Sequence, residues 1–329
     1  MVSIKDVAKQ AGVAISTVSK VLNHYPNISK ETREKVNKAI DELNYVPNSI
    51  AAALSSKQWN RIALIIHFDT QTKAMDEISM QYLSGAIRKA KEYKLDVVTI
   101  FFSMIKEMTV MELERYLQSQ GIKGLIIYRI SKEDMVLHEL LKRETFKAVT
   151  TDALFVNQST STIGVDQTLG QYEVAKKTIL DNSVKSVLYI AGKQNGYVTD
   201  LRLQGMTKVA KELSLELQIQ YGEFSELLAR KLTLAYGEQV DAVICASDLM
   251  AIGAMKALIM MDIFRPVCGY DGITLMGYVG KQMNTVQQNF AKCSEQAVKE
   301  LVRLMNGGRG KSILLEHQIV NLKYEDIIC

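Results

Sequence analysis

From Arg61 onward, short apolar runs alternate with segments that have the spacing of amphipathic helices. Short apolar runs predict buried strands, and apolar residues three and four positions apart predict helices that cover a core. This alternation favours parallel sheets with helices on both faces. The predicted strands are 62–68, 96–102, 124–128, 147–151, 186–191, 241–246 and 266–271, and the predicted helices include 81–93, 168–180, 201–213 and 249–261.

Seven or more strands in this part of the chain predict an α/β core with two doubly wound lobes and a cleft between them. In open parallel sheets, ligands bind beyond the carboxyl ends of the strands. We therefore expect any small-molecule site to lie where the strand ends of the two lobes face each other.

The first 45 residues have a different pattern. Apolar residues with helical spacing recur in 4–11, 14–22 and 30–43, Gly12 interrupts the first pair, and Ser29 is a good N-cap for the third segment. Two short helices around a glycine-containing turn, braced by a third helix, form a helix-turn-helix unit.

The second of these helices has an unusual outward face. On a helix that starts near Ala14, the apolar side chains share one face, and the residues opposite or beside it are Ser16, Thr17, Ser19 and Lys20, with Ile15 at the edge. Short hydroxyls and one cation suit phosphates and base edges better than they suit solvent. A solvated helix face is the alternative interpretation.

Charge and cysteine content agree with a cytoplasmic nucleic-acid-binding protein. Residues 1–60 carry eight Lys/Arg against five Asp/Glu, whereas the other residues carry 32 against 31. The four cysteines are scattered and form no CxxC pair, which is typical of reduced thiols. No signal-peptide core begins the chain, and no apolar run approaches the ~18 residues of a membrane helix.

The segment 47–60 is predicted to be a hinge helix and linker. Pro47 stops the preceding helix, and only about eight residues are then available for a new one, fewer than the ~12–15 that an isolated helix needs in water. We expect this helix to form only against a partner.

Several motifs resemble the lac repressor (LacI/GalR) family of bacterial transcription regulators. The N-terminal match is carried by IKDVAKQAGVAISTVSKVLN, ISKETREKVNKAIDELNYVPN and AAAL. A weaker match in the core is carried by TIGVDQTLGQYEVAKKTI, LRLQGMTKVAKE, ASDLMAIGAMKAL, GYDG and NTVQQNF. The resemblance implies a dimeric regulator, and most simply a repressor. In regulators of this family, a small molecule, usually a sugar or related metabolite, binds between two periplasmic-binding-protein-like lobes. Its binding changes the affinity of the regulator for palindromic operator DNA.

The resemblance also assigns DNA contacts. It places Ile15, Ser16 and Lys20 in the major groove, and it places Ala51 and Leu54 at the minor groove, where Leu54 is the residue that wedges between base pairs. The residues that it assigns to phosphates are Ser3, Thr17, Ser19, Asn23, Ser29 and Thr32. Leu54 packing on the same residue of the other subunit is the alternative. Two departures are Ala14, where the family commonly has a capping Ser, and Lys20, where it commonly has Arg.

The predicted effector site combines charged and aromatic residues. Asp152, Arg202, Asp248 and Asp271 lie at or beside predicted strand ends, where charged groups suit the hydroxyls or carboxylates of a small polar ligand. The alternative is helix capping for Asp248 and an interlobe salt bridge for the others. By resemblance, the site also includes Phe224, Ser247 and Phe290.

The predicted organisation is a helix-turn-helix domain over 1–46, the hinge over 47–60 and an effector-binding and dimerisation core over 61–329. Lobe 1 is expected to hold about 61–161 and 288–314, and lobe 2 about 162–287 and 315–329. The four histidines have neither metal nor triad spacing, so we expect no metal, no cofactor and no enzyme activity. Two alternatives stay open: control by a phosphocarrier protein, and an enzyme core fused to a DNA-binding domain.

Overall fold

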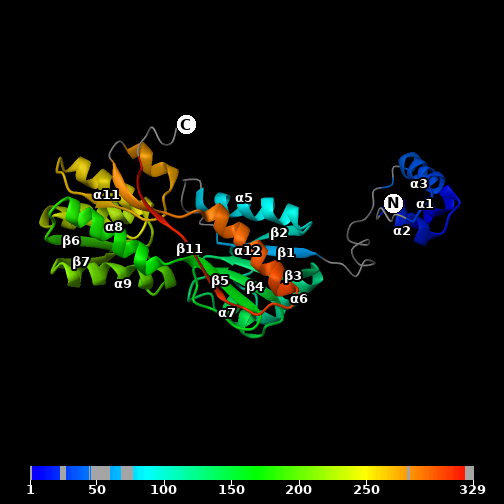
Figure 1. The fold of residues 1–329 in the computed structure, drawn as a ribbon, viewed down its shortest axis with the longest axis horizontal. Helices are drawn as coiled ribbons and strands as arrows, with labels where there is room; N and C mark the ends of the chain where they lie inside the picture. Colours follow the sequence, from blue (N-terminus) through cyan, green and yellow to red (C-terminus); the bar gives the residue numbers. More distant parts are fainter. Residues whose placement is uncertain are drawn as a thin grey trace. The chain divides into compact units, whose positions relative to one another are not determined.

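The computed structural model describes residues 2–22, 27–43, 45, 60–67, 77–279 and 282–322. The chain forms two compact units, Met1–Trp59 and Asn60–Cys329. Within the described residues, the smaller unit is helical and the larger one contains two six-stranded sheets (Figure 1).

The smaller unit contains α1 (Ile4–Ala11), α2 (Ile15–Leu22) and α3 (Lys30–Glu42). Gly12 ends α1 in a left-handed conformation, with φ of 65°, which a residue without Cβ adopts easily. Ser29 caps α3, as predicted, because its hydroxyl accepts the Thr32 N–H at 3.2 Å. The buried core of this unit is Val7, Ala8, Val18, Val21, Val36 and Ala39.

One sheet of the larger unit is entirely parallel, with the strand order β11-β5-β4-β3-β1-β2. Its strands are β1 (Arg61–Ile66), β2 (Asp96–Phe101), β3 (Ile122–Tyr128), β4 (Lys147–Thr151), β5 (Thr160–Val165) and β11 (Ser312–Leu315). Its helices are α5 (Glu77–Glu92), α6 (Val110–Ser119), α7 (Met135–Lys142) and α12 (Phe290–Met305), and a 3₁₀ turn (Phe102–Met104) follows β2. We call this assembly lobe 1.

Lobe 2 is built on the second sheet, with the order β12-β10-β9-β8-β6-β7, in which only the β10–β12 pair is antiparallel. Its strands are β6 (Ser186–Ala191), β7 (Glu216–Tyr221), β8 (Ala242–Cys245), β9 (Val267–Cys268), β10 (Met283–Gln287) and β12 (Gln318–Leu322). Its helices are α8 (Gln167–Asp181), α9 (Tyr197–Glu212), α10 (Glu226–Tyr236) and α11 (Asp248–Met260), with 3₁₀ turns at Gly237–Gln239 and Thr274–Val279.

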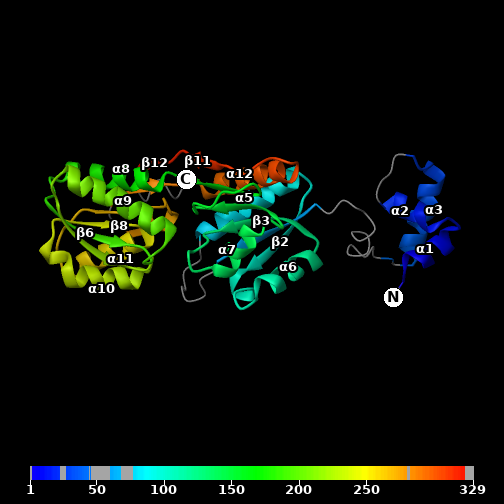
Figure 2. The ribbon, with the colours of Figure 1, turned by 90° about the horizontal axis from the view of Figure 1, so that it is seen from below.

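Helices cover both faces of each sheet, which explains the near-continuous apolar runs of the central strands (Figure 2). In β1, Ile62 and Leu64 pack in the cluster that includes α5 and α12, whereas Ala63 and Ile65 pack in the cluster that includes α6 and α7. The seven predicted strands and four predicted helices are therefore present, with ends that differ by a few residues. The prediction omitted β5, β7, β10, β11 and β12.

Within the described part of the core, the chain passes between the lobes three times. The first crossover lies between β5 and α8, the second between β10 and α12, and the third between β11 and β12. Because β5 runs to Val165 in the sheet of lobe 1, the first crossover comes a few residues later than the predicted boundary at 161.

Helices α5 and α12 approach each other closely at Gly85. A Cβ built on Gly85 would stand 2.1 Å from the backbone oxygen of Ala291, far inside van der Waals contact. This helix pair, which covers one face of the lobe 1 sheet, therefore requires glycine at this position.

Candidate functional site

Helix α2 turns a short polar face outward. Ile15 is 45% exposed and Ser16 and Lys20 are exposed, whereas Val18 and Val21 are buried. Thr17 and Ser19 are half-buried beside this face. The helix begins without a side-chain cap from Ala14, whose carbonyl oxygen accepts the N–H groups of Thr17 and Val18 at 2.9 and 3.2 Å. The side chains predicted to enter the major groove thus lie on one accessible surface.

Three of the hydroxyls predicted to bind phosphates lie at helix starts. The Ser3 hydroxyl donates to the Asp6 carboxylate at 2.7 Å, and the side-chain and backbone hydrogen bonds from Ser3 lower the pKa of the Asp6 carboxyl. The hydroxyls of Ser29 and Thr32 are 2.8 Å apart. These groups hold the ends of α1 and α3, so their first role in the structure is helix capping. Asn23, Ala51 and Leu54 lie outside the described residues, as does nearly all of the predicted hinge.

A cavity of about 480 Å³ lies between the two lobes. Residues that directly follow strands line it: Arg129 follows β3, Asp152 follows β4, and Asp271 lies just beyond β9. Six of the seven predicted effector residues are among its lining: Asp152, Arg202, Phe224, Ser247, Asp271 and Phe290. Strand ends of both lobes therefore meet at one site, as expected for this fold.

Arg202 is the most constrained charged group in the cleft, with 4% of its surface exposed. It donates to Gln167 Oε1 at 2.8 Å, to Asp271 Oδ1 at 3.1 Å and to the carbonyl oxygen of Ala246. Its guanidinium carbon also lies 3.5 Å from the centre of the Tyr270 ring. Three of its five N–H groups thus donate hydrogen bonds within the protein. Arg202 therefore holds Gln167 and Asp271 in position, and it also lines the cleft.

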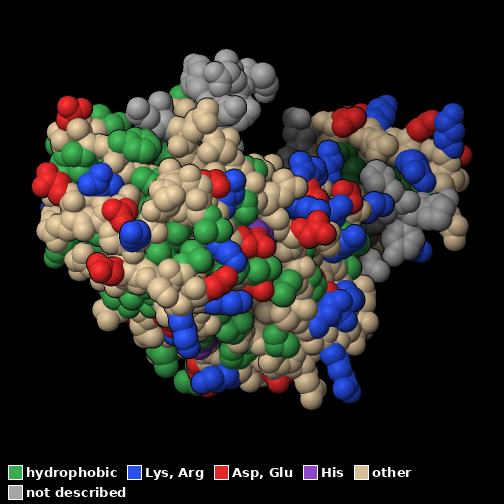
Figure 3. Space-filling view, turned by 60° about the vertical axis from the view of Figure 1, so that its left-hand side comes forward, with side chains coloured by type: hydrophobic (Ala, Val, Ile, Leu, Met, Phe, Trp, Pro, Cys, Tyr) green, Lys and Arg blue, Asp and Glu red, His purple; other side chains and the backbone are tan. Residues whose placement is uncertain are grey.

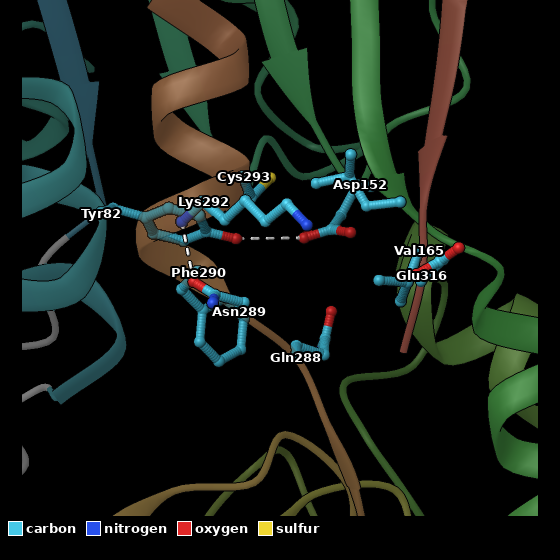
Figure 4. A pocket seen from close by; sticks show the side chains of 11 residues that line it. Tyr82, Asp152, Val165, Gln288, Asn289, Phe290, Lys292, Cys293 and Glu316 are labelled. Atoms are coloured by element: carbon cyan, nitrogen blue, oxygen red, sulfur yellow. Dashed lines mark hydrogen bonds between the residues drawn. The ribbon is translucent and has the colours of Figure 1, made fainter. Parts of the chain in front are cut away.

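Asp152 links the two lobes through Gln167. Its carboxylate accepts the Gln167 amide at 2.9 Å and the Tyr82 hydroxyl at 3.4 Å, and Figure 4 shows the latter contact. Because Gln167 also accepts from Arg202, a continuous polar chain runs from lobe 1 into lobe 2. Burial raises the pKa of Asp152, and the nearby Arg202 charge opposes that shift.

Asp271 continues this chain, since its Oδ1 also accepts the Gln288 amide at 3.1 Å. Burial raises the pKa of Asp271, again against the effect of Arg202. Both members of the Arg202–Asp271 ion pair belong to lobe 2, so this pair is not the interlobe bridge considered as an alternative.

The cleft also gathers strained backbone. Arg129, Asp152, Phe224 and Asp271 have positive φ values of 56°, 56°, 57° and 121°, which non-glycine residues rarely adopt. Such residues concentrate at functional sites because the surrounding structure must hold them. The sequence gives no signal for this strain, nor for Gln167 and Gln288. Arg129 directly follows a predicted strand, so it could have been predicted as Asp152 was, from the rule that ligands bind beyond the carboxyl ends of parallel strands.

Asp248 does not line the cleft. It is fully buried, and its carboxylate accepts the Ile273 N–H at 2.8 Å and the Thr285 hydroxyl at 2.6 Å. Ser247, not Asp248, caps α11 through the Met250 N–H at 3.3 Å. Burial first, and the negative charge of Asp271 second, raise the pKa of Asp248 to about 7.

We expect Asp248→Asn to remove a pH dependence of stability. The unfolded carboxyl titrates near ~3.9, so the folded protein holds an extra proton above that pH and loses stability as pH rises toward about 7. Asparagine can accept from Ile273 and donate to Thr285, and it does not titrate. Relative to wild type, the variant should therefore gain at least about 1.4 kcal/mol of unfolding free energy between pH 5 and pH 8, the equivalent of one pKa unit.

Urea unfolding of both proteins at the two pH values measures this gain. An equal difference between variant and wild type at pH 5 and pH 8 would mean that Asp248 is ionised in the fold throughout.

Ion pairs join the lobes beside the cavity. Lys132, which follows β3, lies 2.5 Å from Asp200 in α9, and Glu133 lies 2.5 Å from Lys193, which follows β6. The carboxylate of Glu77 in α5 also accepts the Thr274 hydroxyl at 2.8 Å. Each contact connects lobe 1 to lobe 2, so any change in lobe opening must break or re-form them.

A second, smaller cavity of about 20 Å³ lies behind Asp152 at the crossovers (Figure 4). Its lining includes Val165, at the end of β5 next to the first crossover, and Gln288 and Glu316, from the second and third crossovers. Its volume suits a single water molecule. The carboxylate of Asp152 therefore lies between the ligand-sized cavity and the connections between the lobes.

Two further features of the described part of the chain bear on function. No helix there is long and apolar enough to cross a membrane. Nor does that part contain a cluster of three or more His, Cys, Asp and Glu residues placed to hold a metal ion.

A helix-turn-helix unit joined to a two-lobed core with an internal cleft defines a ligand-controlled DNA-binding regulator. Residues 3–48 match the family described as "Bacterial regulatory proteins, lacI family", and residues 178–320 match the "Periplasmic binding protein-like domain". The chain thus combines a helix-turn-helix domain of the LacI family with a periplasmic-binding-protein-like core.

The relatives of this chain are regulators and not enzymes. "HTH-type transcriptional repressor PurR" of Histophilus somni is 26% identical over 100% of this chain and 98% of its own length. "Catabolite control protein A" of Staphylococcus aureus is 25% identical, with 97% of each chain covered. The solved lac repressor bound to ONPG in the repressed state has a TM-score of 0.81 at 25% identity, with 97% of this chain and 98% of that chain covered.

Proposed function

We propose that this regulator is a repressor that binds a palindromic operator as a dimer and is controlled by a small polyhydroxylated effector in the interlobe cleft. The observation that carries the proposal is the polar chain Asp152–Gln167–Arg202–Asp271, which lines the cavity and connects the lobes. A ligand that contacts this chain would alter the relative position of the lobes, and hence the DNA-binding unit. As a regulator of bacterial DNA, it would act in the cytoplasm.

The cleft offers what a polyol requires. The carboxylates of Asp152 and Asp271 are acceptors for ligand hydroxyls, and Arg202 has N–H groups beyond the three that are engaged. Phe224 and Phe290 provide apolar walls, and the Phe290 ring lies 5.3 Å from that of Tyr82 in an edge-on contact. A concave cavity with aromatic walls and convergent polar groups is typical of small-molecule sites and gives a protein partner little surface.

A dimer would explain several exposed apolar side chains of the core. Met80 and Ile87 are two helical turns apart on α5 and are 52% and 55% exposed. Ile259 and Met260, at the end of α11, are 54% and 66% exposed. On the face seen in Figure 3, charged side chains of both signs are interspersed with hydrophobic and other side chains. The solved lac repressor dimer bound to operator has a TM-score of 0.82 to this chain at 24% identity.

We also propose the division 1–46, 47–60 and 61–329 for the DNA-binding domain, hinge and core. The compact units support a division near residue 60. The hinge would present Ala51 and Leu54 to the minor groove, and the phosphates would be bound by Ser3, Thr17, Ser19, Asn23, Ser29 and Thr32.

Two substitutions on α2 test the DNA-binding face. Lys20→Ala should relax base preference within each half-site, because an exposed cation in the major groove reads base edges. Thr17→Ala should weaken binding about equally on all sequences, because phosphate contacts carry no sequence information. Selection of binding sites from random DNA, with each variant, measures both effects. Footprints over a single asymmetric half-site would contradict the dimer, and unchanged selection by the Lys20 variant would contradict the assigned groove.

A further inference from the structure

The interlobe cavity has an excess of negative charge. Among the described residues that line it, the carboxylates are Glu77, Glu133, Asp134, Asp152, Glu223 and Asp271, whereas the cations are Arg129, Lys193 and Arg202. His67 is the remaining titratable nitrogen base in this lining. Acids thus outnumber permanent cations by two to one around a space that must hold the effector.

These cations already have partners. Arg202 is paired with Asp271 at 3.1 Å, and Lys193 with Glu133 at 2.5 Å. Arg129 is likewise engaged in an interaction. Within the part of the lining that the structure describes, an incoming anion would therefore have to take a cation away from a carboxylate. For Asp271, whose side chain is only 13% exposed, the carboxylate left behind would then be unpaired in a largely buried position, which is costly.

Neutral amides, in addition to the Arg202 guanidinium, contact the two central carboxylates. Gln167 donates to Asp152 at 2.9 Å, and Gln288 donates to Asp271 at 3.1 Å. Burial raises the pKa of both carboxyls, and the nearby Arg202 charge opposes that shift. A ligand group that donates hydrogen bonds, or that carries positive charge, would improve this balance, whereas a second anion would worsen it.

We infer that the cleft selects its effector by charge: it accepts an uncharged or amino-substituted polyol and rejects the phosphorylated or carboxylated form of the same molecule. This inference rests on the proposed effector site and specifies its ligand class. A phosphate ester brings about −1.5 to −2 charges at pH 7. Its repulsion by the carboxylates is strong in a cavity screened less than bulk water.

Matched ligands test the inference on the full-length protein by titration calorimetry. Each set contains a neutral parent, its phosphate ester and, for the sugars, its amino-deoxy and uronic acid forms. The sets are built on hexoses, pentoses and purine nucleosides. In whichever set binds, the phosphorylated and carboxylated forms should bind at least about tenfold more weakly than the parent, and an amino form at least as tightly as the parent.

One substitution should reverse the discrimination. Glu133→Gln removes the carboxylate paired with Lys193, so the affinity for the phosphate form, measured relative to that for the parent, should rise by about tenfold. Glu139→Gln is the matched control, because Glu139 is exposed on α7, pairs with Arg143 at 3.7 Å and does not line the cavity. It should leave both affinities unchanged.

The outcomes separate the inference from the proposed function. A phosphate form that binds wild type as tightly as its parent overturns charge selection and leaves the effector site in place. Absence of heat from every set overturns the polyol effector and the inference with it. A rise in phosphate affinity with both glutamate variants would overturn the specific role of Lys193.

Discussion

Replacing Arg202 by alanine should abolish the response of operator binding to the effector while leaving operator binding itself measurable. Arg202 joins Gln167, Asp271 and the Ala246 carbonyl, so its loss disconnects the polar chain between the lobes. The change also leaves Asp271, whose side chain is 13% exposed, without its cation, and breaking a largely buried pair in this way costs about 3–5 kcal/mol of unfolding free energy.

Because so large a cost could unfold the core, Arg202→Lys provides a second variant. Lysine keeps the charge beside Asp271 but has no planar fork with which to bind Gln167 and Ala246 at the same time. The Arg202→Lys variant should therefore recover stability, while its operator binding should still respond poorly to the effector. Operator affinity is measured with and without effector for both variants, with Arg115→Ala on the exposed side of α6 as the control. A normal response in both Arg202 variants would mean that the effector binds elsewhere.

Gly85→Ala should destabilise the core strongly even though it adds one methyl group. The new Cβ would stand 2.1 Å from the backbone oxygen of Ala291, and a backbone atom cannot move aside as a flexible side chain can. Helices α5 and α12 must separate, which opens the packing around Ala86, Ala297 and Leu301. Overpacking of this kind typically costs about 1–3 kcal/mol, and more when the backbone has to shift.

Urea unfolding of the two proteins gives this cost directly. Ser84→Ala is the control, because Ser84 is the exposed neighbour on the same helix and alanine there has good helix propensity. We expect the Ser84 variant to unfold at the wild-type urea concentration. Equal unfolding midpoints for the Gly85 variant and wild type would show that α5 and α12 can move apart without a loss of stability.

The sequence predicts the core strands well where both faces of a strand are apolar, and poorly where polar residues are buried. β1 reads as RIALII, but β5 reads as TSTIGV and has little hydrophobic signal. Its Ser161 is buried because the hydroxyl donates to Glu300 at 2.6 Å, a residue 139 positions away. A partner so distant in sequence cannot be deduced from local periodicity. The short β9, which ends at Cys268, is likewise fixed by its neighbours β8 and β10.

The sequence predicts those residues of the candidate site whose position follows directly from the strands. Asp152 and Asp271 follow strands, and parallel strands place their carboxyl ends together. Asp248 follows a strand too, but the hydroxyl of Thr285 and the N–H of Ile273 draw its carboxylate away from the cavity. Gln167, the first residue of α8, and Gln288, between β10 and α12, lie at crossovers whose position depends on how the two lobes meet, so hydrophobic periodicity does not identify them.

The three crossovers also have a consequence for the order in which this chain can fold as it leaves the ribosome. Lobe 1 obtains β1–β5 from the early core but needs α12 (Phe290–Met305) and β11 (Ser312–Leu315) to cover and complete its sheet. Lobe 2 has β6–β10 in one uninterrupted stretch and waits only for the edge strand β12. The lobe that is translated first therefore cannot be completed until nearly the whole chain has been made, and its half-built sheet has an unpaired β5 edge while lobe 2 is synthesised.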